Sequence, residues 1–342
     1  MGERGRGRVG VLMVNTGSPA APTAPAVASY LKTFLMDERI RPLPAPVWRA
    51  ILDHIILPRR SPASAAKYAA IWTDEGSPLI AGCRALAVRV EEELRGDGVA
   101  MPGRGAVVRA AMTYGEPGVE GALRELRSVG CERLVVLPLY PQSAYATTAA
   151  ALDAVARGLR RIGWEPPMTA VESYGDDEGY VDAVAASIWA AGFDPSRDHL
   201  LLSFHAVPLS DVDAGDTYTR QARDTARAVA VRLGLGESTW SLSYQSPFED
   251  GRRWTGPHTA RLVSSLARHE PRRLVVACPG FAVDCLETLY DIERVMRPAY
   301  RAQRGDGGPA LVYVPCLNDT AAHARALAGI VRRALAGEIR LD

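Results

Sequence analysis

The stretch Leu201-Leu202-Ser203-Phe204-His205-Ala206-Val207-Pro208-Leu209-Ser210 indicates how the second half of this chain folds. An apolar run ends in a single histidine, and three residues later Pro208 lacks the N–H group that a central strand needs. We therefore expect His205 at the carboxyl end of a strand, where open parallel α/β sheets bind their ligands. The alternative is a core histidine that closes off the strand.

Similar short aliphatic runs recur along the chain and alternate with longer stretches of helical period, the pattern of βαβ units in a parallel sheet. Strands are expected at residues 9–14, 106–112, 134–139, 169–172, 200–204, 240–244, 274–277 and 311–314. Helices are expected at residues 26–35, 46–57, 63–71, 80–94, 119–129, 147–162, 180–191, 218–233, 258–268, 285–301 and 321–335.

The length of 342 residues exceeds what one ordinary hydrophobic core supports. The strands therefore suit two α/β halves, each with a four-stranded parallel sheet, at residues 1–170 and 171–342. Turn-rich segments at 163–167 and 175–179 both suit the boundary. Residues 16–105 contain several expected helices and no strand, and such an insertion after a first strand is the place for a lid or binding wall.

The composition excludes several classes of protein. Hydrophobic residues make up 47% of the chain and charged residues 23%, as in soluble globular proteins. With 40 basic and 39 acidic residues the formal charge is +1, so no nucleic-acid partner is expected. Five scattered cysteines without a Cys-x-x-Cys pair indicate free thiols in a reducing compartment. We recognise neither a signal peptide nor a run of about 18 apolar residues, and expect a cytoplasmic location.

A second motif runs from Cys278 to Leu289, where a strand ends at a Pro-Gly turn and a helix begins. Asp284 can be the N-cap of this helix. Glu287 and Asp291 can share one helical face, which is either solvated or turned towards His205 and its exchangeable proton. Aromatic residues in loops or at strand ends suit either edge-of-core packing or a flat apolar ligand; they are Tyr114, Tyr140, Tyr145, Trp254 and Phe281.

Taken together, these motifs resemble those of the ferrochelatase family, in the same order and over nearly the whole chain. The shared segments are Val14-Asn15-Thr16-Gly17-Ser18-Pro19, Gly76-Ser77-Pro78-Leu79, Leu139-Tyr140-Pro141-Gln142, Ser203-Phe204-His205-Ala206-Val207-Pro208, Gly215-Asp216-Thr217-Tyr218, Ser243-Tyr244-Gln245-Ser246, Trp254-Thr255-Gly256-Pro257, Cys278 to Leu289, and Val314-Pro315-Cys316-Leu317-Asn318-Asp319.

The resemblance implies the chelatase fold: two similar Rossmann-like halves, each a four-stranded parallel sheet flanked by helices, with a helical lip at about residues 40–80 after the first strand. It implies insertion of ferrous iron into protoporphyrin IX to give protohaem, the last step of haem biosynthesis. Bending the macrocycle would expose its pyrrole protons and nitrogen lone pairs, which is strain directed at the transition state.

The same resemblance implies roles for individual residues. His205 matches the family's acceptor of pyrrole protons, and Glu287 matches a glutamate on the opposite wall that acts in proton relay or in metal handling. Both are expected to contact the metal, and Asp291 is a candidate for a further relay. The positions expected to bind the porphyrin or to hold the lip are Thr16, Arg60, Ser77, Tyr114, Ser246, Trp254 and Phe281.

Three positions depart from the family pattern. Ser143 follows Tyr140-Pro141-Gln142 where relatives often have a tyrosine, and the nearest tyrosine is Tyr145. Thr113 stands where an arginine is common, so a basic pocket residue is missing. Val295 interrupts the line of acids that starts at Glu287, which leaves a metal path along that line incomplete.

The remaining expectations concern partners and cofactors. No permanent cofactor is expected, since ferrous iron is a substrate and only Cys316 lies near the C-terminus, where some relatives hold an iron–sulfur cluster. Apolar residues within 40–57 suit a helix packed on its own domain, or a lip that touches the inner membrane where the porphyrin enters. The oligomeric state is not indicated.

Three alternatives to this function stay open. Residues 56–60 and 71–76 look like the Gram-negative bacterial form, which favours protoporphyrin over coproporphyrin III. Within the same fold, the alternative is a chelatase for another metal or tetrapyrrole. The alternative from another functional class is a non-catalytic protein that binds a tetrapyrrole or another solute, which would need neither His205 nor Glu287.

Overall fold

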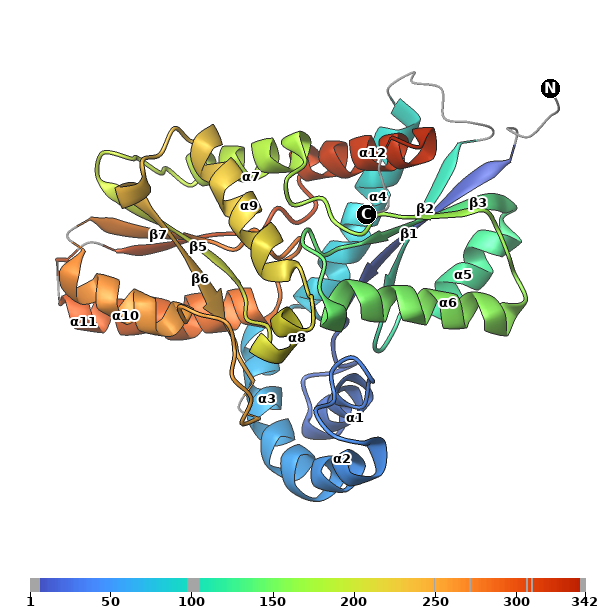
Figure 1. Ribbon diagram of the computed structural model, residues 1–342, viewed down its shortest axis with the longest axis horizontal. Coiled ribbons are helices and arrows are strands. Elements are labelled where there is room, and N and C mark those ends of the chain that lie inside the picture. The colour runs from blue at the N-terminus through green and yellow to red at the C-terminus, as the bar shows by residue number, and fades with distance from the viewer. Residues whose placement is uncertain are drawn as a thin grey trace. The chain divides into compact units, whose positions relative to one another are not determined.

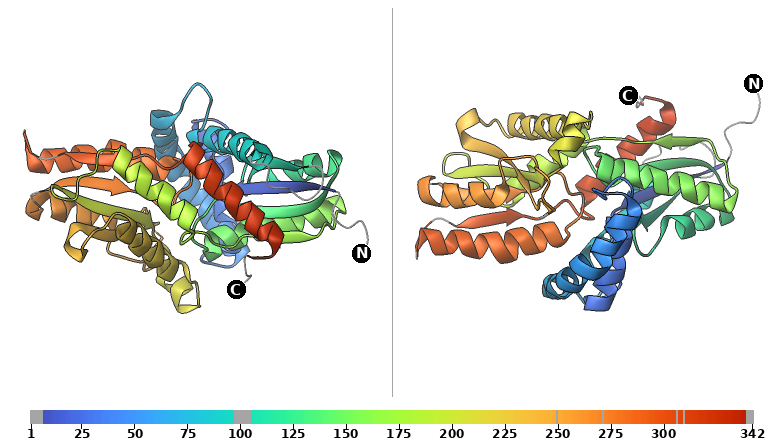
Figure 2. Two further views of the ribbon diagram at one scale, coloured as in Figure 1. Left: turned by 90° about the horizontal axis from the view of Figure 1, so that it is seen from above. Right: turned by 60° about the horizontal axis from the view of Figure 1, so that its bottom comes forward.

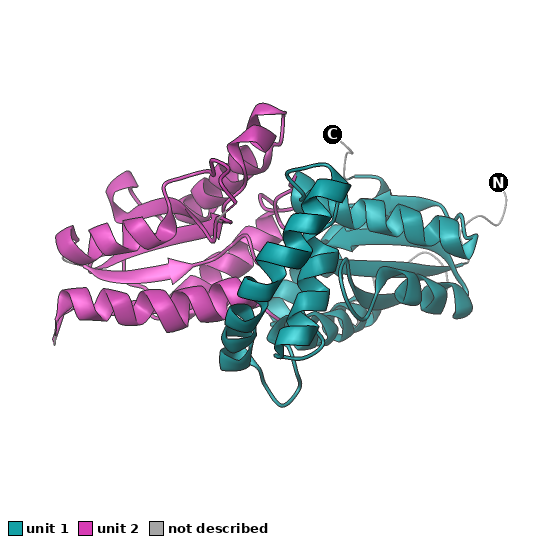
Figure 3. Cartoon of the chain, turned by 90° about the horizontal axis from the view of Figure 1, so that it is seen from below, with its two compact units in different colours: residues 1–139, 145–172, 319–342 teal, residues 140–144, 173–318 magenta. Residues whose placement is uncertain are grey.

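A computed structural model describes residues 7–96, 105–248, 250–270, 272–305, 307–308 and 310–338. The chain forms two compact units (Figure 3). Unit 1 comprises Met1–Leu139, Tyr145–Glu172 and Asp319–Asp342, and unit 2 comprises Tyr140–Ala144 and Ser173–Asn318. The boundary near residue 172 lies close to the one expected from the sequence, but the last segment of the chain belongs to unit 1 and not to the second half.

Unit 1 is a parallel sheet with helices on both faces (Figure 1). Its strands, in the order β2-β1-β3-β4, are β1 (Arg8–Asn15), β2 (Ala106–Met112), β3 (Cys131–Pro138) and β4 (Met168–Ala170). One face carries α5 (Val119–Ser128), the π-helix η2 (Tyr145–Ala149) and α6 (Ala150–Ile162), and the other carries α4 (Pro78–Gly96) and α12 (Ala321–Ala336). The inner side chains of α12, among them Leu327 and Val331, are fully buried, which explains why this last helix is part of unit 1.

The insertion after β1 is helical, as expected. Ahead of α4 it contains α1 (Ala24–Leu35), α2 (Ala45–Ile51), the π-helix η1 (Leu52–Ile56) and α3 (Leu57–Ile71), and Figure 2 shows α1 to α3, in blue, grouped together. The sequence predicted two separate helices here, at residues 46–57 and 63–71. In the structure α2, η1 and α3 follow one another without a break, with Pro58 in the first turn of α3 and Pro62 inside it.

Unit 2 repeats the architecture of unit 1. Its strands, in the order β6-β5-β7-β8, are β5 (Asp198–His205), β6 (Trp240–Gln245), β7 (Arg273–Ala277) and β8 (Leu311–Val314). One face carries α7 (Glu178–Ala190) and α9 (Tyr218–Arg232), and the other carries α10 (Thr259–His269), the π-helix η4 (Leu286–Met296) and α11 (Arg297–Arg304). Two short helices, α8 (Leu209–Asp213) and the 3₁₀-helix η3 (Glu237–Thr239), were not predicted.

The predicted fold class is confirmed. All the expected strands are present, and in each unit the first strand lies between the second and the third, with parallel pairing throughout. The residues Leu200 to Phe204 of β5 are completely buried, as expected for a strand covered by helices on both faces. Such near-continuous apolar runs are what made the strands recognisable in the sequence.

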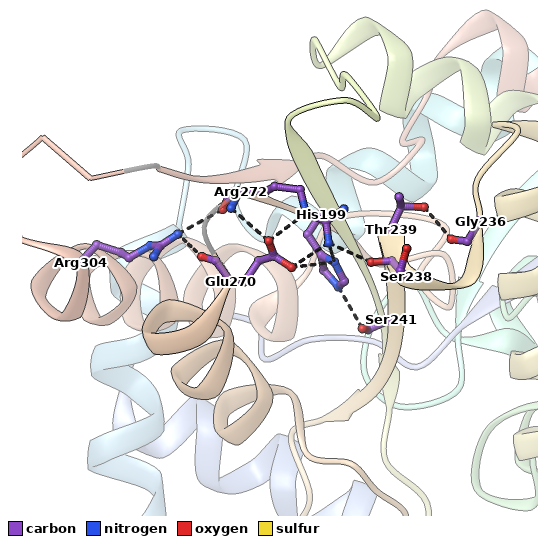
Figure 4. Close-up of polar contacts among 8 residues, drawn as sticks. All are labelled: His199, Gly236, Ser238, Thr239, Ser241, Glu270, Arg272 and Arg304. Atoms are coloured by element: carbon purple, nitrogen blue, oxygen red, sulfur yellow. Dashed lines mark hydrogen bonds and ion pairs between the residues drawn. The ribbon is translucent and has the colours of Figure 1, made fainter.

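A polar network closes the amino end of the sheet in unit 2 (Figure 4). His199 Nε2 lies 2.9 Å from Ser241 Oγ, and His199 Nδ1 lies 3.5 Å from Glu270 Oε2 and 3.4 Å from Arg272 Nη2. Arg272 binds the Glu270 carboxylate through Nε and Nη2, each at 2.8 Å, and Arg304 donates to the backbone oxygens of both residues. Burial lowers the pKa of His199, and the Arg272 hydrogen bonds lower the pKa of Glu270 to about 2.

We predict that His199 makes the stability of the protein depend on pH. The pKa of His199 is depressed in the fold below its usual 6.5, so the unfolded chain binds the proton first as the pH falls. The contribution of His199 is therefore complete above pH 6.5 and is lost below it. His199→Gln should cost about 1–3 kcal/mol at pH 7.5. It should also reduce the decline in the free energy of unfolding between pH 7.5 and 5.5, measured by urea titration. An equal decline in both proteins would contradict the prediction.

Candidate functional site

The strand order places a candidate site at one edge of the sheet in unit 2. From β5 the chain moves first to β6 on one side and then to β7 on the other, so the connections diverge at the carboxyl end of β5. In open α/β sheets, ligands bind in the crevice at such a switch point. His205 is the last residue of β5, as the sequence predicted, and residues that follow β6 and β7 surround it.

The imidazole of His205 is held in one tautomer. Its Nδ1 lies 2.6 Å from the backbone oxygen of Ala206, and because a carbonyl oxygen can only accept, Nδ1 carries the hydrogen. Nε2 is then the basic nitrogen. His205 is only partly buried, unlike the rest of β5, which favours a site residue over a core histidine. The arrangement provides a proton acceptor at the edge of the sheet.

Aromatic rings surround the imidazole. Phe248 meets the His205 ring edge-on, with centroids 6.2 Å apart, and Phe281 lies tilted at 6.4 Å. Trp254 packs on Phe248 at 5.1 Å, so the structure brings three aromatic side chains together beside His205. The sequence pointed to Trp254 and Phe281 but missed Phe248. Its position just after β6 was the available signal.

Hydrogen bonds fix the loop that carries Trp254. Thr255 donates its N–H to the oxygen of Val207 at 3.0 Å, and Thr255 Oγ1 accepts from the Val207 N–H at the same distance. The Trp254 indole donates to Asp250 Oδ1 at 3.2 Å, and the Arg252 guanidinium lies 5.1 Å over the indole ring. Burial opposes ionisation of Asp250, but the hydrogen bonds from Arg252 and Trp254 outweigh it and lower the pKa of this carboxyl. The Trp254 side chain is therefore held by the Asp250 carboxylate at its N–H and by the Arg252 guanidinium over its ring.

Opposite the end of β6, η4 begins with a cap that differs from the predicted one. Cys285, and not Asp284, is the N-cap, and its backbone N–H donates to Thr288 Oγ1 at 2.9 Å. The buried Asp284 carboxylate instead accepts from Thr288 Oγ1 at 2.9 Å, from Tyr313 at 2.5 Å and from Asn318 Nδ2 at 2.7 Å. Asp284 thus joins the start of η4 to the segment that follows β8.

Glu287 and Asp291 lie on η4, and both are partly exposed. The sequence predicted an α-helix here, in which the two residues are one turn apart; in the wider π-helix the turn takes more residues. Two residues at the end of β6 hold this helix: Gln245 Nε2 donates to the Glu287 carbonyl at 2.7 Å, and Ser246 Oγ donates to Asp291 Oδ2 at 2.6 Å. Unit 2 therefore brings together His205, Ser246, Trp254, Phe281, Glu287 and Asp291.

The other predicted residues belong to unit 1. Thr16 follows β1, and its carbonyl accepts from the Tyr114 N–H at 2.9 Å. Gly17 has a φ of 112°, and a Cβ there would stand 1.9 Å from the Tyr114 oxygen, so this turn requires glycine. The Tyr114 ring is buried and meets Phe34 edge-on at 5.2 Å. Ser77 is buried just before α4, and Arg60 is exposed on α3.

Across the described ranges, no group of three or more His, Cys, Asp or Glu side chains is arranged to hold a metal ion. The five cysteines are buried as free thiols, and burial raises the pKa of Cys278, Cys285 and Cys316. No helix in those ranges combines the length and hydropathy that crossing a membrane requires.

Comparison with known proteins identifies relatives over the whole chain. The family model described as ferrochelatase matches residues 8–335. A ferrochelatase of Nitrosococcus oceani is 41% identical over 337 residues, covering 98% of this chain and 89% of the relative. One of Aromatoleum aromaticum is 42% identical over 328 residues, covering 95% and 87%. Among solved structures, SirB from Bacillus subtilis with Fe³⁺ superposes with a TM-score of 0.60 at 13% identity, covering 98% of this chain and all of SirB, which supports the fold alone.

We predict that Asp284 stabilises the start of η4. Asp284→Asn replaces an acceptor of several donors by an amide that presents its own N–H groups to them. It should lower the free energy of unfolding by about 1.5–3 kcal/mol. Tyr313→Phe is the matched control, because it removes one donor and leaves the carboxylate paired with Thr288 and Asn318. It should cost about 1 kcal/mol. Urea titrations that give equal losses for both variants would contradict this role for Asp284.

Proposed function

The chain belongs to the ferrochelatase family, and we propose that it inserts ferrous iron into protoporphyrin IX to give protohaem, as a lyase of haem biosynthesis. The observation that carries the proposal is the tautomer of His205. Its Nδ1–H donates to the Ala206 carbonyl, which leaves a basic Nε2 at the switch point of the sheet, among aromatic rings suited to a flat apolar ligand.

In the proposed reaction two pyrrole protons leave the porphyrin and one ferrous ion takes their place, so the ring changes from a neutral free base to a neutral metal complex. His205 Nε2 accepts a pyrrole proton and passes it to solvent. Because the imidazole is partly exposed, it can repeat this step for the second pyrrole proton. The Ala206 carbonyl keeps the ring oriented while the proton moves and stabilises the imidazolium that forms. Bending of the macrocycle presents the nitrogen lone pairs to the metal.

Glu287 supplies the second group of the proposed mechanism. On η4 it acts either as a second proton relay or as the residue that hands iron to the porphyrin, and a carboxylate suits both because it binds protons and hard cations. Asp291, fixed by the Ser246 hydroxyl, is proposed as the next relay. Trp254 and Phe281 would pack on the macrocycle. For unit 1 the proposal keeps the roles that the family resemblance implies for Thr16, Arg60, Ser77 and Tyr114, with Arg60 as a charge-assisted partner of a propionate.

We also propose that iron is a substrate only, and that the protein holds no iron–sulfur cluster. Cluster ligands are thiolates. The thiols of Cys278, Cys285 and Cys316 are buried, and burial raises their pKa, which disfavours the thiolate form that a cluster needs and supports this proposal. Ultraviolet–visible spectra of the anaerobically purified protein without cluster bands would agree with it.

Metalation is the test of the proposed function. The protein is incubated anaerobically with ferrous iron and either protoporphyrin IX or coproporphyrin III, and the absorbance change of metal insertion is followed. Turnover with protoporphyrin at the higher kcat/KM is expected. A preference for coproporphyrin would replace the proposed substrate, and binding without turnover of either would favour a carrier protein over an enzyme.

We predict that His205→Ala lowers kcat by about 10²- to 10⁴-fold, because it removes the proton acceptor, while protoporphyrin still binds. Fluorescence titration measures the binding and the metalation assay measures turnover. His199→Gln, at the other end of the same strand, is the control and should keep its turnover. Retained activity in His205→Ala would assign the proton acceptor to another residue.

We further propose that the lip touches an anionic membrane surface. Its exposed apolar side chains include Leu43 at 41%, Val47 at 53% and Ile55 at 49% exposure. The triple change of these residues to Ser should reduce flotation with phosphatidylglycerol vesicles, because it removes apolar area available for burial. Val231→Ser, at a 78% exposed site on α9, is the control. Equal flotation of the wild type and the triple variant would contradict lip contact.

A further inference from the structure

The side chain of Gln245 is buried at the centre of the site in unit 2, and no separate role was predicted for it. Gln245 is the last residue of β6, is 1% exposed, and lies in register with His205 on β5. Its backbone oxygen accepts from the N–H of Ala206 at 2.8 Å. The same Ala206 provides the carbonyl that fixes the His205 ring, so Gln245 already holds the main chain beside the imidazole.

The amide of Gln245 joins three elements that are far apart in the sequence. Its Oε1 accepts from Ser203 Oγ at 2.5 Å and from Cys278 Sγ at 3.5 Å, and its Nε2 donates to the Glu287 carbonyl at 2.7 Å. Ser203 is two residues before His205 on the same face of β5, and Cys278 follows β7 directly. One side chain therefore connects the end of β5, the end of β7 and the first turn of η4.

The orientation of this amide follows from the chemistry of its partners. The Glu287 carbonyl can only accept, so it requires the NH₂ group, and the Cys278 thiol stays protonated in its buried position and acts as a donor to Oε1. Ser203 Oγ is in turn 2.8 Å from Thr259 Oγ1, which is 2.8 Å from Ser243 Oγ. This chain of hydroxyls fills the interior behind His205. An apolar side chain at 245 would leave Ser203, Cys278 and the Glu287 carbonyl without this partner.

We propose that Gln245 is a positioning residue that sets the distance and orientation between His205 and Glu287. The inference rests on the proposed function, in which both residues act on one porphyrin. Gln245 touches the main chain of Glu287 and the strand of His205, and its burial keeps it away from the substrate. Misplacing reacting groups by about 1 Å can cost about 100-fold in rate, so loss of this link should act on kcat.

Gln245→Met keeps the length of the side chain and removes all three hydrogen bonds. It should lower kcat for metalation by about 10- to 100-fold and leave the KM for protoporphyrin unchanged, because the residue contacts no substrate. Ser203→Ala removes only the link to β5 and should lower kcat less. In the double variant the two effects should not add, because both changes break the same connection.

His199→Gln is the matched control, since it weakens the same sheet at its amino end, away from η4. Its kcat should stay at the wild-type value, so the double variant His199→Gln/Gln245→Met should have the same kcat as Gln245→Met alone. The proposal is overturned if Gln245→Met turns over like the wild type, if its loss appears in KM, or if Ser203→Ala and Gln245→Met act additively. If Gln245→Met does not fold, Ser203→Ala tests the proposal instead. A kcat of Ser203→Ala equal to that of the wild type would then overturn it. A wild-type protein without turnover would refute the proposed function itself, and the inference with it.

Discussion

The site in unit 2 depends on the parallel pairing of β5 with β6 and β7. Parallel strands place all their carboxyl ends at one edge of a sheet, and here the register pairs His205 with Gln245 and Leu202 with Ala277. Without this register, residues 205, 245 and 278 would not meet. A shift of one residue would turn His205 and Ser203 to the opposite face and break every contact of the Gln245 amide.

The two histidines of β5 show how environment decides the role of a side chain. His199, at the amino end, contacts partners through both ring nitrogens and is nearly inaccessible, so it contributes to stability. His205, at the carboxyl end, has only Nδ1 fixed by the backbone, and it lies among aromatic rings in a partly exposed position. The same residue type therefore stabilises one end of the strand and presents a basic nitrogen at the other.

The sequence predicted the sheets well because their signal is local: each strand is a short, buried aliphatic run between turns. The position of His205 followed from such a run and from Pro208. The π-helical form of η4 could not be predicted in this way, because over so few turns the apolar periodicity of a π-helix resembles that of an α-helix. The contacts of Phe248, the amide of Gln245 and the carboxylate of Asp284 were also missed, because their partners lie tens of residues away in the chain. The assignment of α12 to unit 1 depends on burial against distant elements in the same way.

The structure shows the surroundings of two of the three positions that depart from the family pattern, Ser143 and Val295. Ser143 is held through its backbone N–H, which donates to Gln221 Oε1 at 2.8 Å, so the loop after β3 is fixed in place by its main chain and needs no phenol for that contact. Val295 is 48% exposed at the far end of η4, where Glu293 is ion-paired with Arg297 at 2.8 Å. Arg294 is also exposed there. The outer part of η4 therefore exposes Val295 and Arg294, and its acid Glu293 is paired with Arg297. The carboxylates of Glu287 and Asp291 belong instead to the part of η4 that Gln245 and Ser246 hold at the end of β6. Val295 thus ends the line of acids where the contacts with β6 end.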